Sequence, residues 1–169
     1  VDGGATNSIT LTSTASLAAQ SGLAIQATGG AVTNTTNSGL VTGNVDLGAG
    51  SGAFGNLIGG TFVPNTIVNL GGGNLNNDGF LNLGGTKNIV ATVLNGNFVQ
   101  STTGKLAVDV QFGQTPSDVL AATGTANVRG LVAPFLMWLA PSAPVPNTDD
   151  IAASAPLKWP SPRPIMNTG

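Results

Sequence analysis

Charged side chains are the residues of this 169-residue chain that could do chemistry, and they are few. The chain has seven Asp, three Lys and two Arg, and it contains no His, Cys, Glu or Tyr. Without His or Cys, the usual ligands of zinc, haem and iron–sulfur clusters are missing, and so are Ser–His or Cys–His nucleophile pairs and disulfides. We therefore expect no cofactor, no metal and no enzymatic activity.

The spacing of the acidic residues gives little support to carboxylate chemistry. Asp46, Asp78, Asp109 and Asp118 lie 9 to 32 residues apart in the sequence. Carbohydrate-active β-helix enzymes group such acids on one face, often around calcium, and an enzyme of this kind is the less favoured alternative. The Gly71–Asp78 segment departs from the calcium-binding G-G-x-G-x-D-x-U repeat because its Asp comes two positions late. We expect Asp78 in a turn and Asp109 on the solvent side of a strand.

The composition excludes several classes of protein. Gly (25), Thr (20), Asn (17) and Ser (11) dominate, whereas charged residues make up 7% and hydrophobic residues 41% of the chain. Disordered chains combine low hydrophobicity with high net charge, but the net charge here is only −2. The chain also lacks the basic surface that binds nucleic acid, and its longest apolar run, residues 131–140, is too short to span a membrane. A low charge tolerates self-association, so an oligomer or a fibre is a candidate assembly.

A glycine followed by a short apolar segment recurs along the first hundred residues. The copies begin at Gly22, Gly39, Gly60, Gly79 and Gly96, with spacings of 17, 21, 19 and 17 residues. A period near 20 without a helical pattern predicts a parallel β-solenoid, in which stacked coils bury the core and Asn or Thr side chains form ladders. An antiparallel sandwich with Gly-rich turns is the alternative. The residues expected to point inward are Leu23, Ile25, Leu40, Phe62, Phe80 and Phe98.

Beyond residue 94 the pattern changes to strict alternation. Leu106, Val108, Val110 and Phe112 share one face of a predicted half-buried strand. We expect residues 95–105 to form a hairpin with a loop of four to five residues.

The last 37 residues, 133–169, differ again because they hold eight of the ten Pro, both Trp and both Met. Such a composition favours an extended, polyproline-like arm. The anchors that we expect to dock this arm are Phe135, Met137, Trp138 and Trp159. The arm would pack on the open end of its own solenoid, on a neighbouring subunit or on a membrane surface.

Four segments together resemble the C-terminal part of an autotransporter (type V secretion) passenger. They read NNDGFLNLGG at 76–85, LNGNFVQ at 94–100, GKLAVDV at 104–110 and SDVLAATGTA at 117–126. The segment NSGLVTGNV at 37–45 is similar to the repeated coils of such passengers. The resemblance covers about residues 30 to 130 and ends where the Pro-rich arm begins.

The resemblance implies a right-handed parallel β-helix that is secreted or displayed on the surface of a bacterial outer membrane. It also implies that residues 94–130 match the junction, or autochaperone, region that helps the passenger fold. We therefore divide the chain into solenoid coils (1–93), an autochaperone-like end region (94–132) and an arm (133–169). The expected function is that of a stalk, an adhesin or a subunit of a surface structure, with a cell-surface glycan or protein as a candidate partner. A self-assembling fibre subunit joined through the arm is the alternative.

Overall fold

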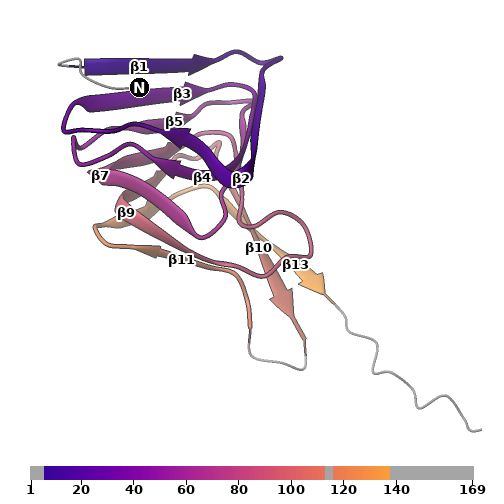
Figure 1. Ribbon diagram of the computed structural model, residues 1–169. Coiled ribbons are helices and arrows are strands. Elements are labelled where there is room, and N and C mark those ends of the chain that lie inside the picture. The colour runs from indigo at the N-terminus through magenta and orange to yellow at the C-terminus, as the bar shows by residue number, and fades with distance from the viewer. Residues whose placement is uncertain (1–5, 113–115, 138–169) are drawn as a thin grey trace, which may run out of the picture. The chain divides into compact units, whose positions relative to one another are not determined.

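The computed structural model describes residues 6–112 and 116–137, which form thirteen β-strands and no helix (Figure 1). These strands stack as a β-solenoid of about five turns, so the all-β, parallel solenoid predicted from the glycine period is confirmed. The described ranges contain no helix, and therefore no helix that is long and apolar enough to cross a membrane. The strands are β1 (Thr6–Leu11), β2 (Ser16–Gln26), β3 (Val32–Asn37), β4 (Leu40–Asp46), β5 (Phe54–Asn56), β6 (Thr61–Val63), β7 (Ile67–Asn77), β8 (Phe80–Asn82), β9 (Ala91–Gln100), β10 (Lys105–Gln111), β11 (Val119–Ala122), β12 (Ala126–Val128) and β13 (Leu131–Met137).

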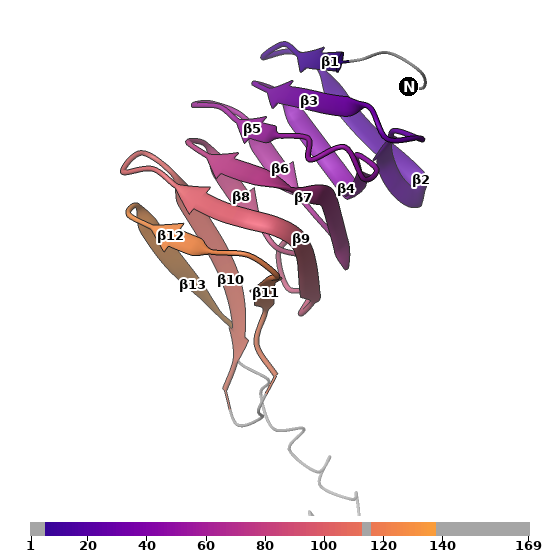
Figure 2. The same cartoon turned by 90° about the vertical axis from the view of Figure 1, so that its left-hand side faces the viewer.

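Each coil contributes strands to three ladders, and within all three the pairing is parallel. The first ladder runs β1, β3, β5, the end of β7, the end of β9 and β12, as Figure 2 shows. The second ladder runs from the start of β2 through β4, β6, β8 and β10 to β13. The third joins the ends of β2 and β4 to the starts of β7 and β9, and then to β11. The alternative of an antiparallel sandwich is therefore wrong for the described residues. Among them, the one antiparallel pairing is an isolated bridge between Val110 and Ser117.

The hairpin expected at residues 95–105 is also wrong. β9 and β10 do not pair with each other, because each pairs with strands of neighbouring coils. Residues 101–104 instead turn the corner between two ladders, and the N–H of Gly104 donates to the carbonyl of Ser101 at 3.2 Å. A Cβ at Gly104 would collide with the carbonyl oxygen of Asn77 in the coil before, so this close approach requires glycine.

The core is a set of stacked apolar side chains inside the coils. Val41, Phe62 and Leu81 lie in register on the second ladder, and each is fully buried. Phe54 of the first ladder stacks on Phe62, with ring centroids 4.4 Å apart. Burying a side chain of this size stabilises the fold by roughly 1.5–3 kcal/mol, and because every coil needs its neighbours for this burial, the coils stabilise one another.

The inward face predicted from the sequence is correct for some coils and one residue out of phase in others. Ile25, Phe62 and Phe98 are buried as expected. Leu40 is 37% exposed, and Leu23 and Phe80 are half-buried. The reason is that the residue directly after a corner glycine points outward and the second points inward. The second residues after Gly39, Gly60 and Gly79 are the buried Val41, Phe62 and Leu81.

β10 is covered on parts of both faces, which the alternation did not predict. Leu106 is buried as expected, but Phe112 is 54% exposed. On the opposite face, Ala107 and Asp109 are buried because residues 83–90 cross over them. Asp109 is only 1% exposed, so its predicted place in solvent is wrong.

The described residues place two of the four predicted arm anchors in a regular strand. Phe135 and Met137 lie in β13, which pairs with β10 along its whole length. The sequence-based boundary at 132/133 thus falls inside β13, and the boundary at 93/94 falls inside β9. Trp138 and Trp159 lie outside the described residues.

Candidate functional site

Four buried amides form a hydrogen-bonded row inside the solenoid, which we call the inner amide ladder (Asn37, Asn56, Asn77 and Gln100). Each of them ends a strand of the first ladder, and each is at most 1% exposed. The side-chain N–H groups of Asn37, Asn56 and Asn77 each donate to the amide oxygen in the next coil, at 2.9, 2.9 and 3.0 Å. The amide nitrogens also donate to backbone carbonyls at 3.0–3.2 Å, which belong to Thr61, Phe80, Lys105 and Leu131.

The inner amide ladder ties four successive coils together. A buried hydrogen bond contributes about 1 kcal/mol, but a buried amide left without its partner costs about 1–3 kcal/mol. Coils out of register would break this row, so the ladder specifies one register as well as adding stability. The expectation of an Asn ladder is confirmed, and the hydroxyls of Thr10 and Thr36 are also paired, at 3.3 Å.

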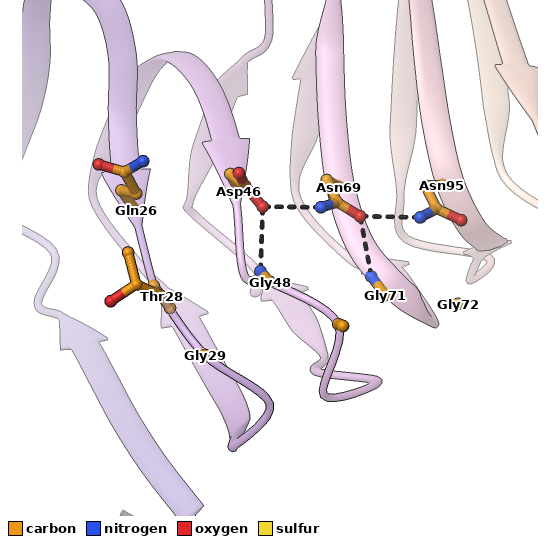
Figure 3. Close-up of a pocket in the computed structure, with 11 residues that line it drawn as sticks. Gln26, Thr28, Gly29, Asp46, Gly48, Asn69, Gly71, Gly72 and Asn95 are labelled. Carbon is orange, nitrogen blue, oxygen red and sulfur yellow. Dashed lines mark hydrogen bonds between the residues drawn. The ribbon is translucent and has the colours of Figure 1, made fainter. Parts of the chain in front are cut away.

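A second polar row, Asp46, Asn69, Asn95 and Thr123, lies on the outside of the solenoid, and we call it the outer polar row. The Nδ2 of Asn69 donates to Asp46 at 2.7 Å, that of Asn95 donates to Asn69 at 2.8 Å, and the Thr123 hydroxyl donates to Asn95 at 3.4 Å. The Asp46 and Asn69 oxygens also accept the backbone N–H groups of Gly48 and Gly71 at 3.0 and 3.1 Å (Figure 3).

An open groove of about 550 Å³ lies along the outer polar row. Amide and hydroxyl groups from successive coils face it, together with glycine turns, and Asp46 supplies its single carboxylate (Figure 3). A surface of this kind can exchange hydrogen bonds with a neutral, hydroxyl-rich ligand, but one carboxylate does not provide the acid and base of a glycosidase. The lining residues are Gln26, Ala27, Thr28, Gly29, Asp46, Gly48, Ala49, Asn69, Gly71, Gly72 and Asn95.

The fold brings together one pair of the acids noted in the sequence, Asp109 and Asp118. The carboxylate of Asp118 accepts the backbone N–H of Asp109 at 2.6 Å and that of Val90 at 2.7 Å. Asp109 Oδ2 accepts the N–H of Asn88 at 2.9 Å, whereas its Oδ1 is buried with no hydrogen-bond partner among the described residues. Desolvation by burial, with a smaller contribution from the Asp109 charge, raises the pKa of Asp118 despite its backbone hydrogen bonds.

This acid pair fastens the segment at residues 88–90 to β10 and to the start of β11. Both carboxylates are buried, and neither lines the groove along the outer polar row. Asp46 lies on the outer polar row, and Asp78 lines a smaller hollow of about 260 Å³ with Thr103 and Lys105. Within residues 6–112 and 116–137, no three His, Cys, Asp or Glu residues gather as a metal site would require.

The last described coil leaves apolar side chains open to solvent. Leu131 is 55% exposed, Leu136 63%, and the predicted anchor Phe135 42%. Met137, the second anchor in β13, is half-buried. The two anchors therefore lie at the end of the solenoid where we expected apolar contacts, but as members of a coil strand.

Comparisons with known protein families, with curated proteins and with solved structures found no match to this chain. The fold defines the class of protein as a parallel β-solenoid, which is compatible with an autotransporter passenger.

Sequence reasoning missed the acid pair and the outer polar row. The signal for the outer polar row was present, because Asp46-Leu-Gly48 and Asn69-Leu-Gly71 share one pattern 23 residues apart. The acid pair had no such signal, since its burial depends on a crossing segment some 20 residues upstream of Asp109.

Proposed function

We propose that this chain is a non-enzymatic extracellular β-solenoid that acts as a stalk, an adhesin or a subunit of a surface structure, as an autotransporter passenger segment does. The observation that carries the proposal is the inner amide ladder, which commits buried polar groups in four successive coils to holding one coil on the next. A segment built in this way transmits position and load along its axis, and its length is set by the number of coils.

Two further features are compatible with an extracellular role. The coils are joined by hydrogen bonds and burial in a chain without Cys, so folding does not depend on the redox state of the compartment. The surface groove along the outer polar row presents amide and hydroxyl groups, which suit a cell-surface glycan as the partner of an adhesin.

The test of this proposal is where the protein lies and what it binds. Antibody labelling and protease treatment of intact cells of the source organism should find the chain outside the cell. Glycan and matrix-protein arrays then separate an adhesin, which binds, from a stalk, which does not. A chain that stays in the cytosol after protease treatment would contradict the proposal.

Within this function, residues 94–130 act as the folding nucleus of the coils. β9 supports this role because it pairs with three other strands, β7, β11 and β12. Deleting residues 94–130 should slow or abolish refolding of the upstream coils, measured by circular dichroism. An unchanged refolding rate and spectrum would remove this role.

The alternative is a fibre subunit joined through the C-terminal arm, and two exposed apolar residues favour it, Leu131 just before the arm and Phe135 within it. In the full chain, Trp138→Ala and Trp159→Ala should then each weaken association by about 2 kcal/mol. Sedimentation at matched concentrations measures the loss, and unchanged association in both variants would exclude the arm as the joint.

A further inference from the structure

Each end of the solenoid has strands that are paired on one side only within the described residues. At the N-terminal end, β1 pairs with β3, and residues 16–18 of β2 pair with β4. At the C-terminal end, β12 pairs with β9, and β13 pairs with β10. Figure 2 shows these strands at the two opposite ends of the stack. An unpaired edge is a template for another strand unless charges or Pro residues block it.

Neither edge carries such a block where the coil ladders would continue. β1, β2, β12 and β13 contain no charged residue. Residues 131–133 of β13 are in register with residues 105–107, 61–63 and 40–42 of the earlier coils, and through these with residues 16–18 of β2. Pro134 lies one position beyond this segment and does not interrupt it.

The inner amide ladder stops one coil short of each end, and aliphatic residues take its place. Leu11 occupies the position before Asn37, and Val128 occupies the position after Gln100. The terminal amides are satisfied within the chain, because Asn37 Oδ1 accepts the N–H of Gly39 at 3.0 Å and Gln100 donates to the carbonyl of Leu131 at 3.1 Å. The C-terminal end therefore offers the exposed Val128 and Val132, and the N-terminal end offers the partly buried Ile9 and Leu17 beside the buried Leu11. Neither end has an unpaired ladder amide.

We propose that the C-terminal coil edge, formed by β12 and residues 131–133, binds the N-terminal coil edge of a second copy, formed by β1 and residues 16–18. Continued parallel stacking places Leu11 of one copy on Val128 of the other, and Leu17 on Val132. Val128 and Val132 are 44% and 45% exposed, so the contact buries apolar surface that a single chain leaves open. This inference rests on the coil register and does not depend on the proposed function.

A second copy is favoured over another partner because the N-terminal edge of one copy continues the in-register rows of residues that end at the C-terminal edge of the other. The coil that would follow β12 and β13 needs an aliphatic residue beside Val128 and another beside Val132, and β1 and β2 provide Leu11 and Leu17 in that order. The two surfaces differ from each other, so the contact is heterologous and each added copy leaves a new free edge. The assembly is accordingly open-ended and does not stop at a dimer.

The test blocks each edge separately in the full chain. Val128→Lys blocks the C-terminal edge, Ile9→Lys blocks the N-terminal edge, and Leu17→Lys is a second, independent N-terminal block. Ile58→Lys is the matched control, because Ile58 is 72% exposed and lies on neither edge. Circular dichroism verifies that each variant is folded before sedimentation equilibrium is measured over a range of concentrations.

The unmodified chain and the Ile58→Lys variant should show a mass that rises with concentration past twice the 16.6 kDa of one chain. Each edge-blocked variant alone should stay monomeric, and a mixture of one N-terminal and one C-terminal variant should give a one-to-one dimer and nothing larger. A monomeric unmodified chain, which is the outcome if residues 138–169 cover the edge in the same molecule, would overturn the proposal. So would assembly of the N-terminal variants by themselves, because these variants lack a free N-terminal edge and their assembly would have to use another contact, such as the C-terminal arm.

Discussion

Removing one amide from the middle of the inner amide ladder should destabilise the whole stack. Asn56 is 1% exposed, accepts a hydrogen bond from Asn37 at 2.9 Å, and donates to Asn77 at 2.9 Å and to the carbonyl of Phe80 at 3.1 Å. Asn56→Ala deletes these three hydrogen bonds and leaves a buried acceptor on Asn77 without its donor. At about 1 kcal/mol for each bond, with a desolvation cost of about 1–3 kcal/mol for the orphaned group, we expect a loss of about 4–6 kcal/mol.

Urea unfolding followed by far-ultraviolet circular dichroism measures this loss as a lower midpoint. Asn95→Ala is the matched control, because Asn95 donates a comparable bond to Asn69 at 2.8 Å from an exposed position, where water replaces the lost partner. The control should lose less than about 1 kcal/mol. Equal losses in the two variants would refute the argument that burial gives the inner ladder its strength.

Three further changes test the packing, the corners and the acid pair. Phe54→Ala, which removes a fully buried ring, should cost about 3–5 kcal/mol in urea unfolding, and a cost under about 1 kcal/mol would contradict the stacked core. Gly79→Ala should lower the thermal midpoint because its Cβ would collide with two carbonyl oxygens of the coil before, whereas Gly30→Ala, which meets nothing within 4 Å, should leave that midpoint unchanged. The pKa of Asp118 is raised above its ordinary value of 3.8, so the folded state holds this proton more tightly than the unfolded state does. Its contribution to stability is therefore present in acid and lost as the pH rises through the raised pKa. Asp109→Asn should reduce that loss in urea titrations by removing the like charge, and an identical pH profile in the variant would show that the two carboxylates are not coupled.

The coil period could be predicted from the sequence because each corner has a local cause. Glycine recurs where the chain passes close to the backbone of the previous coil, as at Gly104, so the period of the fold is visible as a period of glycine. The phase of the inward face was less visible. It depends on how the corner rotates the next residue, which sends Leu40 outward and Val41 inward.

The burial of Asp109 could not be predicted, because it depends on a contact far away in the sequence. Alternation in residues 106–112 describes one strand, whereas the cover over Asp109 comes from residues 83–90 of another coil. The hairpin expected at residues 95–105 failed for a related reason. A strand, a short polar loop and a second strand look alike in sequence whether the strands pair with each other or with neighbouring coils.

Cross-linking of neighbouring coils tests the parallel stack most directly, and the absence of natural Cys makes the result unambiguous. Leu40 and Thr61 are partners in register on adjacent coils, whereas Phe80 lies one coil further, in register with Thr61. Strands about 4.8 Å apart meet the geometric requirement of a disulfide, and strands two coils apart do not. Under mild oxidation, the double variant Leu40→Cys with Thr61→Cys should form an intramolecular disulfide nearly completely, and Leu40→Cys with Phe80→Cys should form none. Failure of the first pair to cross-link, or equal cross-linking of both pairs, would contradict the stacked parallel solenoid.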